Sequence, residues 1–297
     1  MRRLSSSLIA VTMVVSSLVG GMPTARAGTT DDAFYVSLGD SLAVGYQPGP
    51  GGNGEGYVDD LWRSVRETIP TLQMQKFSCV GETSRSMITG NRSNCTYDEG
   101  SQLDAAVAFL DSHVGQVPFI TIDIGANDLL FRCFSREGLL HRPCVMDLVP
   151  RVGDRLTRII DALRAAGPDV PILGMTYYNP FLGFWGLIPH GRVLAKVAAR
   201  GWTVLNIGLT TAYEGAGAVV ADVATTFRID DFSDTVLVPG RGRLPLNVAV
   251  ACRWTWFCSP RYAGDPHANA IGYRKVAHTF DLELQPLLLA RTLKAGS

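Results

Sequence analysis

Short apolar segments alternate along this chain with longer segments of helical periodicity, and this alternation constrains the fold more than any other feature. Five short segments have the apolar or alternating pattern of strands. Strands that alternate with helices predict an α/β protein with a mainly parallel, five-stranded sheet. We expect the strands at 34–38, 72–77, 117–124, 170–176 and 219–223, and the main helices at 57–69, 103–110, 145–166, 194–214 and 269–289.

Polar or glycine residues follow three of the expected strands. Gly39-Asp40-Ser41 comes after the first strand, Gly81 after the second and Gly125-Ala126-Asn127 after the third. Asp265-Pro266-His267 stands just before the closing helix. Ligands of open α/β sheets bind beyond the carboxyl ends of the strands, so we expect these segments to meet at one edge of the sheet.

The residue types in these segments suit acyl transfer to water. Ser41 supplies a hydroxyl nucleophile, which needs a neighbouring base, and the imidazole of His267 titrates in the right range. Asp265 can hold that imidazole in its productive tautomer. We expect the oxyanion donors to be the backbone N–H of Ser41, the backbone N–H of Gly81 and the side-chain amide of Asn127.

The order Gly-Asp-Ser-Leu, glycine, Gly-x-Asn-Asp and Asp-x-His resembles the SGNH (GDSL) hydrolase superfamily over nearly all of the chain after the first residues. The resemblance implies a three-layer α/β/α, flavodoxin-like fold and carboxyl-ester hydrolysis without a metal or cofactor. It assigns the site to Ser41, Gly81, Asn127, His267 and Asp265. Many members place the acid three residues before the histidine, and here it is two before. Some members use a backbone carbonyl instead of an acid, and that alternative stays open.

The N-terminus has the pattern of a secretory signal peptide. Two arginines precede an uncharged stretch that runs to Ala25-Arg26-Ala27, so we expect export and cleavage after Ala27, with an uncleaved anchor as the alternative. A single domain would then span 28–297. The leader removes three arginines and no acid, which leaves 24 basic and 27 acidic residues. This balance argues against nucleic acid partners.

Six cysteines follow the leader, an even number that predicts disulfides in an exported chain. Spacings of 16, 11 and 6 residues favour the neighbour pairs Cys79–Cys95, Cys133–Cys144 and Cys252–Cys258, although sequence alone leaves other connectivities open. No C-x-x-C or Cys/His spacing typical of zinc occurs, so we expect no metal. The leader and the three cysteine pairs most resemble the secreted actinobacterial esterase/lipase branch.

The expected function is that of a secreted serine carboxyl-ester hydrolase, an esterase or lipase that forms an acyl-enzyme on Ser41. A carbohydrate acetylesterase and a catalytically inactive binding protein are the alternatives. The aromatic segment 177–188 is either core or an acyl-binding wall, and Trp254, Trp256 and Phe257 could form a second wall. We expect a monomer that acts on small-molecule or lipid esters, with transient contact to a lipid interface as one option.

Overall fold

The computed structural model describes residues 32–50, 54–134 and 140–295, and the expected leader at 1–27 lies outside them. Its centre is a five-stranded sheet in the order β2-β1-β3-β4-β5, and every neighbouring pair of strands is parallel. The strands are β1 (Ala33–Gly39), β2 (Leu72–Lys76), β3 (Phe119–Asp123), β4 (Ile172–Met175) and β5 (Val219–Ala221). All five expected strands are therefore present, and the sheet that they form is parallel, as expected.

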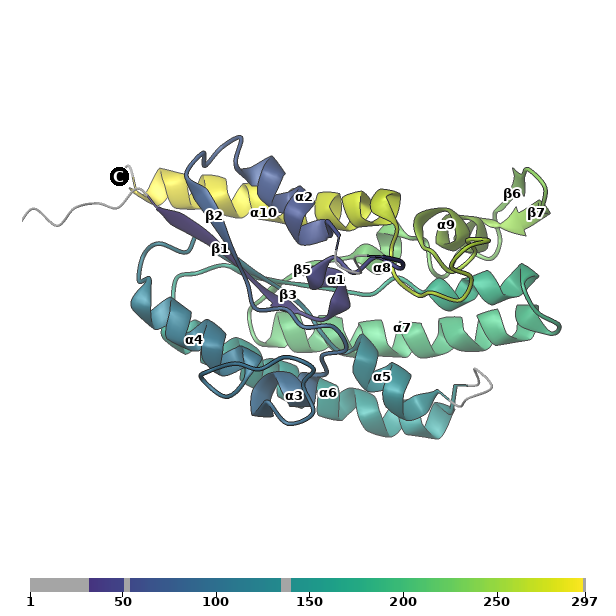
Figure 1. The fold of residues 1–297 in the computed structure, drawn as a ribbon, viewed down its shortest axis with the longest axis horizontal. Helices are drawn as coiled ribbons and strands as arrows, with labels where there is room; N and C mark the ends of the chain where they lie inside the picture. The colour runs from purple at the N-terminus through teal and green to yellow at the C-terminus, as the bar shows by residue number, and fades with distance from the viewer. Residues whose placement is uncertain (1–31, 51–53, 135–139, 296–297) are drawn as a thin grey trace, which may run out of the picture. The chain divides into compact units, whose positions relative to one another are not determined.

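Helices cover both faces of this sheet (Figure 1). One face carries α2 (Tyr57–Val65) and α10 (Ala270–Ala295), which pack on each other. The opposite face carries α4 (Gln102–Ser112), α6 (Arg142–Ala166) and α7 (Gly191–Gly215). The arrangement is a three-layer α/β/α sandwich of the flavodoxin-like type, as the sequence predicts.

The middle strand β3 shows why the layers form. All five of its residues are buried, because helices cover it on both faces and a strand pairs with it on each side. Such strands consist of continuous apolar runs instead of alternating ones. This is the pattern of Phe119-Ile120-Thr121-Ile122, in which the hydroxyl of Thr121 lies 2.6 Å from the hydroxyl of Tyr35 on β1.

Helix α7 continues through two glycines that weaken the helical signal in the sequence. A Cβ at Gly201 would lie 1.8 Å from Leu140, and a Cβ at Gly208 would lie 2.2 Å from Val149 of α6. Gly208 therefore allows α6 and α7 to pack closely, and Gly201 makes room for Leu140, which precedes α6. This packing outweighs the intrinsic cost of glycine in a helix of about 1 kcal/mol each.

Several shorter elements were not expected. The stretch 227–245 contains an antiparallel hairpin, and the stretch 177–190 contains a 3₁₀ helix. These elements are β6 (Thr235–Val238), β7 (Gly242–Pro245), η1 (Pro180–Gly186), α1 (Ser41–Val44), α3 (Ser84–Thr89), α5 (Ala126–Cys133), α8 (Val223–Thr226) and α9 (Leu246–Trp254). Among the described residues, no helix combines the length and the apolar character that a membrane span needs.

Candidate active site

Ser41 is the first residue of α1, and Asp40 alone separates it from the end of β1. The side chain of Asp40 caps this short helix by accepting a hydrogen bond from the backbone N–H of Leu42 at 2.9 Å. Gly39 has a φ of +151°, and a Cβ there would lie 2.2 Å from the carboxyl group of Asp123. The turn that presents Ser41 therefore requires glycine on both steric and conformational grounds.

The imidazole of His267 lies between Ser41 and Asp265. Its Nε2 is 2.9 Å from the Oγ of Ser41, and its Nδ1 is 2.9 Å from the Oδ1 of Asp265. The same Oδ1 accepts the backbone N–H of His267 at 2.9 Å. In the described part of the chain the acid, not a backbone carbonyl, is the hydrogen-bond partner of Nδ1.

The segment that carries His267 is anchored on both sides. The carbonyl of His267 accepts the backbone N–H of Trp256 at 2.9 Å, and the hydroxyl of Tyr178 donates to the carbonyl of Pro266 at 3.1 Å. The ring of Tyr46 lies against the imidazole with 4.3 Å between the ring centres. These contacts fix the ring next to Ser41 although the two residues are 226 positions apart.

The residues that carry the three expected oxyanion donors, Ser41, Gly81 and Asn127, line one cavity together with His267. The backbone N–H groups of Ser41 and Gly81 have no acceptor among the described residues. Asn127 lies in the first turn of α5, and its Nδ2 donates one hydrogen bond to the carbonyl of Glu82 at 2.9 Å. An amide nitrogen carries two hydrogens, so this bond orients the group and leaves the second hydrogen available.

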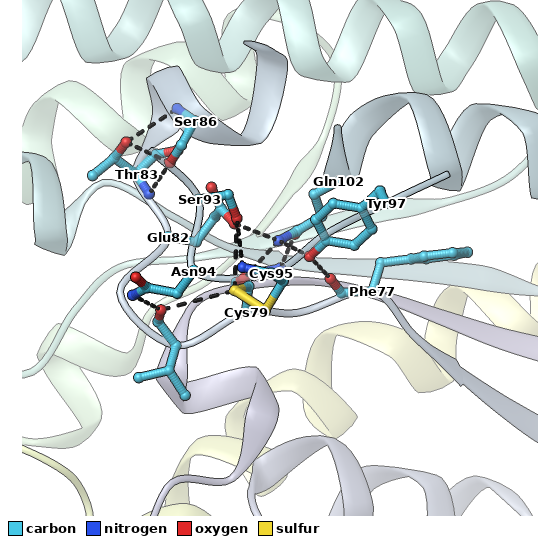
Figure 2. Close-up of a disulfide and its surroundings, with 12 residues drawn as sticks. Phe77, Cys79, Glu82, Thr83, Ser86, Ser93, Asn94, Cys95, Tyr97 and Gln102 are labelled. Atoms are coloured by element: carbon cyan, nitrogen blue, oxygen red, sulfur yellow. Dashed lines mark hydrogen bonds between the residues drawn. A yellow bond between two sulfur atoms is a disulfide. The ribbon is translucent and has the colours of Figure 1, made fainter. Parts of the chain in front are cut away.

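The loop that carries Gly81 is tied to its surroundings, as Figure 2 shows. The Cys79–Cys95 disulfide joins its two sides, and the Nδ2 of Asn94 donates to the carbonyl of Val80 at 2.8 Å. Gln102 connects the region to the end of β1, because its Oε1 accepts the N–H of Gly39 at 2.7 Å. The loop and the turn before Ser41 thus share one network of hydrogen bonds.

Two buried acids lie behind Ser41. Asp40 and Asp123 are 2% and 0% exposed, and the Oδ2 of Asp123 accepts the backbone N–H of Asp40 at 3.2 Å. The hydroxyl of Tyr177 donates to Asp40 at 2.9 Å, and that of Tyr57 donates to Asp123 at 2.6 Å. Burial raises the pKa of Asp123 well above its ordinary value, and the negative charge of Asp40 adds to this increase. Burial thus favours the protonated form of Asp123.

The cavity beside Ser41 has a volume of about 250 Å³. The aromatic segment 177–188 provides part of its wall through its first residues, whereas Leu187 and Ile188 are exposed to solvent. Trp202 of α7 also lines it, and no pattern in the sequence marks that residue for this place. Its main apolar lining residues are Leu130, Phe131, Tyr178, Pro180, Phe181 and Trp202.

Trp254, Trp256 and Phe257 do not line this cavity, so the expected second wall is absent from it. Trp254 packs edge-on against Phe227, and the indole N–H of Trp256 donates to Gln47 at 2.7 Å. Phe257 is buried against the rings of η1. A larger cavity of about 900 Å³, lined largely by α6 and α7, contains none of the expected site residues.

Three disulfides are present, Cys79–Cys95, Cys133–Cys144 and Cys252–Cys258. Each joins cysteines that are neighbours in the sequence, and each lies in or beside a segment that carries a site residue. Within the described ranges, no group of three or more His, Cys, Asp or Glu side chains is arranged to hold a metal ion.

Solved structures of known proteins are similar to this chain in fold. It is similar to a protein from Parabacteroides merdae described as a GDSL-like lipase (13% identity, TM-score 0.54, 86% of this chain and 96% of that chain covered). It is also similar to a lipase from a goat rumen metagenome (16%, TM-score 0.53, 84% and 96%) and to an extracellular lipase from Streptomyces rimosus (17%, TM-score 0.50, 83% and 99%).

At these identities the similarity to solved structures concerns the fold. No curated protein matches the sequence. Residues 37–275, which include every site residue described above, match the GDSL-like lipase/acylhydrolase family. The chain therefore belongs to the GDSL-like lipase/acylhydrolase family.

Proposed function

We propose that this protein is a carboxyl-ester hydrolase, an esterase or lipase, that forms an acyl-enzyme on Ser41. The observation that carries the proposal is the continuous series of contacts from the Oγ of Ser41 through His267 to Asp265, with 2.9 Å at each step. This arrangement joins a nucleophile, a base and a group that orients the base.

In the first half of the reaction the Oγ of Ser41 attacks the ester carbonyl carbon while the Nε2 of His267 takes the hydroxyl proton. The oxyanion accepts hydrogen bonds from the N–H groups of Ser41 and Gly81 and from the amide of Asn127. When the tetrahedral intermediate collapses, the C–O bond to the alcohol breaks and His267 gives its proton to the leaving oxygen. Water then repeats the sequence on the acyl-enzyme and releases the acid.

The apolar cavity is the proposed acyl site. Its volume of about 250 Å³ is near the lower limit for ligand pockets. At about 30 Å³ per atom-sized group it holds an acyl chain of about eight heavy atoms. Its aromatic and aliphatic wall favours alkyl acyl groups over the acetyl groups that a carbohydrate acetylesterase removes, although that enzyme would use the same catalytic residues.

The proposal includes export. The leader at 1–27 has the composition of a signal peptide, and three disulfides suit an oxidising compartment. We propose that the mature protein is a monomeric single domain that spans 28–297, is secreted and belongs to the actinobacterial-type branch of the family.

Ser41→Ala tests the nucleophile. We expect turnover of p-nitrophenyl octanoate to fall at least about 10³-fold, with unchanged far-UV circular dichroism and melting temperature, because the variant lacks the attacking oxygen. A fluorophosphonate probe should label the wild-type protein at Ser41. Ser112→Ala, an exposed serine on α4, is the matched control and should keep full activity.

Undiminished turnover in a folded Ser41→Ala protein would refute the proposed nucleophile. A wild-type protein that neither turns over esters nor reacts with the probe would be an inactive binding protein. Relative rates on p-nitrophenyl acetate, octanoate and palmitate and on acetylated xylan separate an esterase for alkyl acyl groups from a carbohydrate acetylesterase.

A further inference from the structure

Besides the apolar cavity, another cavity borders the expected oxyanion donors, with a volume of about 320 Å³. We call it the second cavity. Gly81, Asn127 and Phe131 line both this cavity and the apolar one. The two cavities are therefore adjacent, and both border the residues that the ester carbonyl oxygen must reach, Gly81 and Asn127. A substrate that places its acyl chain in the apolar cavity has its alcohol portion free to extend into the second one.

The second cavity differs from the first in charge. Four arginines line it, and they come from separate parts of the fold: Arg85 from α3, Arg92 from the following loop, Arg132 from the end of α5 and Arg155 from α6. The single acid in its lining is Asp128. The cavity thus carries an excess of positive charge, whereas the lining of the apolar cavity contains no arginine or lysine.

One of these arginines is already neutralised. The guanidinium of Arg155 lies 3.3 Å from the Oδ1 of Asp128, which is 3% exposed. Burial raises the pKa of Asp128, and the charge of Arg155 acts against that increase. Arg85 and Arg92 form no ion pair with any described residue, so their charge is available to a ligand.

The chemistry of the lining indicates the kind of ligand. Arginine presents several N–H donors in a planar fork that matches the oxygens of a phosphate group. Thr83, Ser86 and Asn91 add hydroxyl and amide groups to the same wall. Side chains of this kind around a cavity next to an ester-cleaving site suit a leaving alcohol that carries a phosphate.

We propose that this cavity binds the alcohol portion of the substrate, and that the preferred substrates are alkyl esters of phosphorylated alcohols, of which acyl glycerol phosphates are the simplest. The inference rests on the proposed ester hydrolysis at Ser41 and adds the substrate class. Arg85 and Arg92 bind the phosphate oxygens while the acyl chain occupies the apolar cavity.

The test compares two esters that differ only in the phosphate, 1-octanoylglycerol and 1-octanoylglycerol 3-phosphate, below their critical micelle concentrations. We define the selectivity as kcat/KM for the phosphorylated ester divided by kcat/KM for the neutral one. We expect a wild-type selectivity of at least about tenfold, because charge-assisted hydrogen bonds exceed the energy of a tenfold preference. Added salt should lower it through screening.

The variant for this test is Arg85→Gln/Arg92→Gln, which removes both charges and keeps polar side chains. We expect its selectivity to fall at least about tenfold relative to the wild type. Arg243→Gln is the matched control, because Arg243 is an exposed arginine of β7 that lines neither cavity, and its selectivity should equal that of the wild type.

Inhibition gives a second measurement that needs no phosphorylated ester. Glycerol 3-phosphate should raise the KM of the wild-type protein for p-nitrophenyl octanoate and should have a much weaker effect on the double variant. If inorganic phosphate inhibits as strongly as glycerol 3-phosphate, the phosphate site is still supported. The protein would then recognise the phosphate group and not the glycerol.

Equal wild-type turnover of both esters, together with an unchanged ratio in the double variant, would overturn the substrate class and leave ester hydrolysis intact. Selectivity that appears only in mixed micelles would also overturn it, because the preference would then belong to a charged surface and not to the cavity. Failure to hydrolyse either ester, with Ser41 unlabelled by fluorophosphonate, would refute the proposed function itself.

Discussion

Asp123 lies beneath the turn that carries Ser41, at the end of the middle strand, and its carboxyl group is buried with that of Asp40. Two carboxylates cannot both be charged at such close range without a large cost. The Oδ2 of Asp123 accepts the backbone N–H of Asp40 at 3.2 Å, and the side chain of Asp40 caps the helix that begins at Ser41. The pair thus positions the turn.

The raised pKa of Asp123 makes stability depend on pH. Asp123 binds a proton more tightly in the folded protein than in the unfolded chain. The free energy of unfolding therefore falls as pH rises from about 3.9, the pKa of the acid in the unfolded chain, towards its raised pKa in the folded protein. Asp123→Asn keeps a hydrogen-bond donor and removes this titration. We expect the difference in unfolding free energy between variant and wild type to shift in favour of the variant as pH rises through this window.

Urea unfolding at intervals from about pH 4 to about pH 9 measures this difference. Asp111→Asn, an exposed acid on α4, serves as the control and should follow the wild-type curve. Parallel curves for Asp123→Asn and the wild type would show that Asp123 is charged in the folded protein.

Asp265 can be tested separately from the nucleophile. Its carboxylate contacts both the Nδ1 and the backbone N–H of His267, but it does not line the apolar cavity. We therefore expect Asp265→Ala to lower kcat by about 10²–10⁴-fold and to change KM little, because the base loses its orientation and its charge support. Steady-state kinetics checks this with Asp154→Ala, an exposed acid of α6, as the control. An unchanged kcat would mean that another group supports His267.

At the scale of elements, the disulfides reinforce the loops at the site. Cys79 lies two residues before Gly81, Cys133 ends the helix that carries Asn127, and Cys258 lies seven residues before Asp265. Each bridge closes a short loop, of 16, 11 and 6 residues in sequence separation. A bridge over a loop of about 15 residues contributes about 3 kcal/mol to stability. The core between the sheet and its covering helices does not depend on the disulfides. Reduction should therefore disorder the loops at the site before it unfolds the protein.

We expect mild reduction to lower ester turnover before the far-UV circular dichroism changes. The double variant Cys79→Ser/Cys95→Ser should reproduce the effect, because the loop of Gly81 loses its closure while β1 and β2 keep their pairing. Activity and circular dichroism recorded during titration with dithiothreitol give the order of the two events. A simultaneous loss of both signals would show that the bridges maintain the whole fold.

The sequence predicts the long elements well and the short ones poorly. Strands such as β3 and β4 carry buried apolar runs, β2 alternates apolar and polar residues, and helices such as α6 and α7 are long enough for their periodicity to show. The short helices α3 and α5 depend on local caps and on packing. The side chain of Thr83, for example, caps α3 by accepting a hydrogen bond from the backbone N–H of Ser86. The hairpin in 227–245 has too few apolar positions to be recognised.

The same division applies to the site. The motif residues can be recognised from the amino-acid order alone, because each follows a recognisable strand or precedes the closing helix. The cavity walls cannot, since Trp202 reaches the acyl cavity from the middle of α7. Likewise Arg85 and Arg155 line the same cavity only because α3 packs on α6. Contacts between elements distant in sequence leave no local signal.

At the scale of the whole molecule, the first strand that the structure describes, β1, lies a few residues after the proposed cleavage site. We expect protein secreted by a bacterial host to begin at Gly28, because signal peptidases cut after small residues such as those of Ala25-Arg26-Ala27. Mass spectrometry of the N-terminal peptide from the culture medium checks this, and Ala27→Arg should reduce cleavage. Full-length protein retained in the membrane fraction would instead indicate an uncleaved anchor.

Ser41 and His267 lie 226 residues apart in the sequence, and His267 precedes α10, the last helix, by only three residues. Under the proposed export from the N-terminus, Ser41 crosses the membrane long before His267, and the two residues meet only when α10 packs against α2 and the strands β4 and β5. Under the proposed function, incomplete chains therefore lack the base that activates Ser41. We expect ester turnover to appear only when folding has reached the C-terminus.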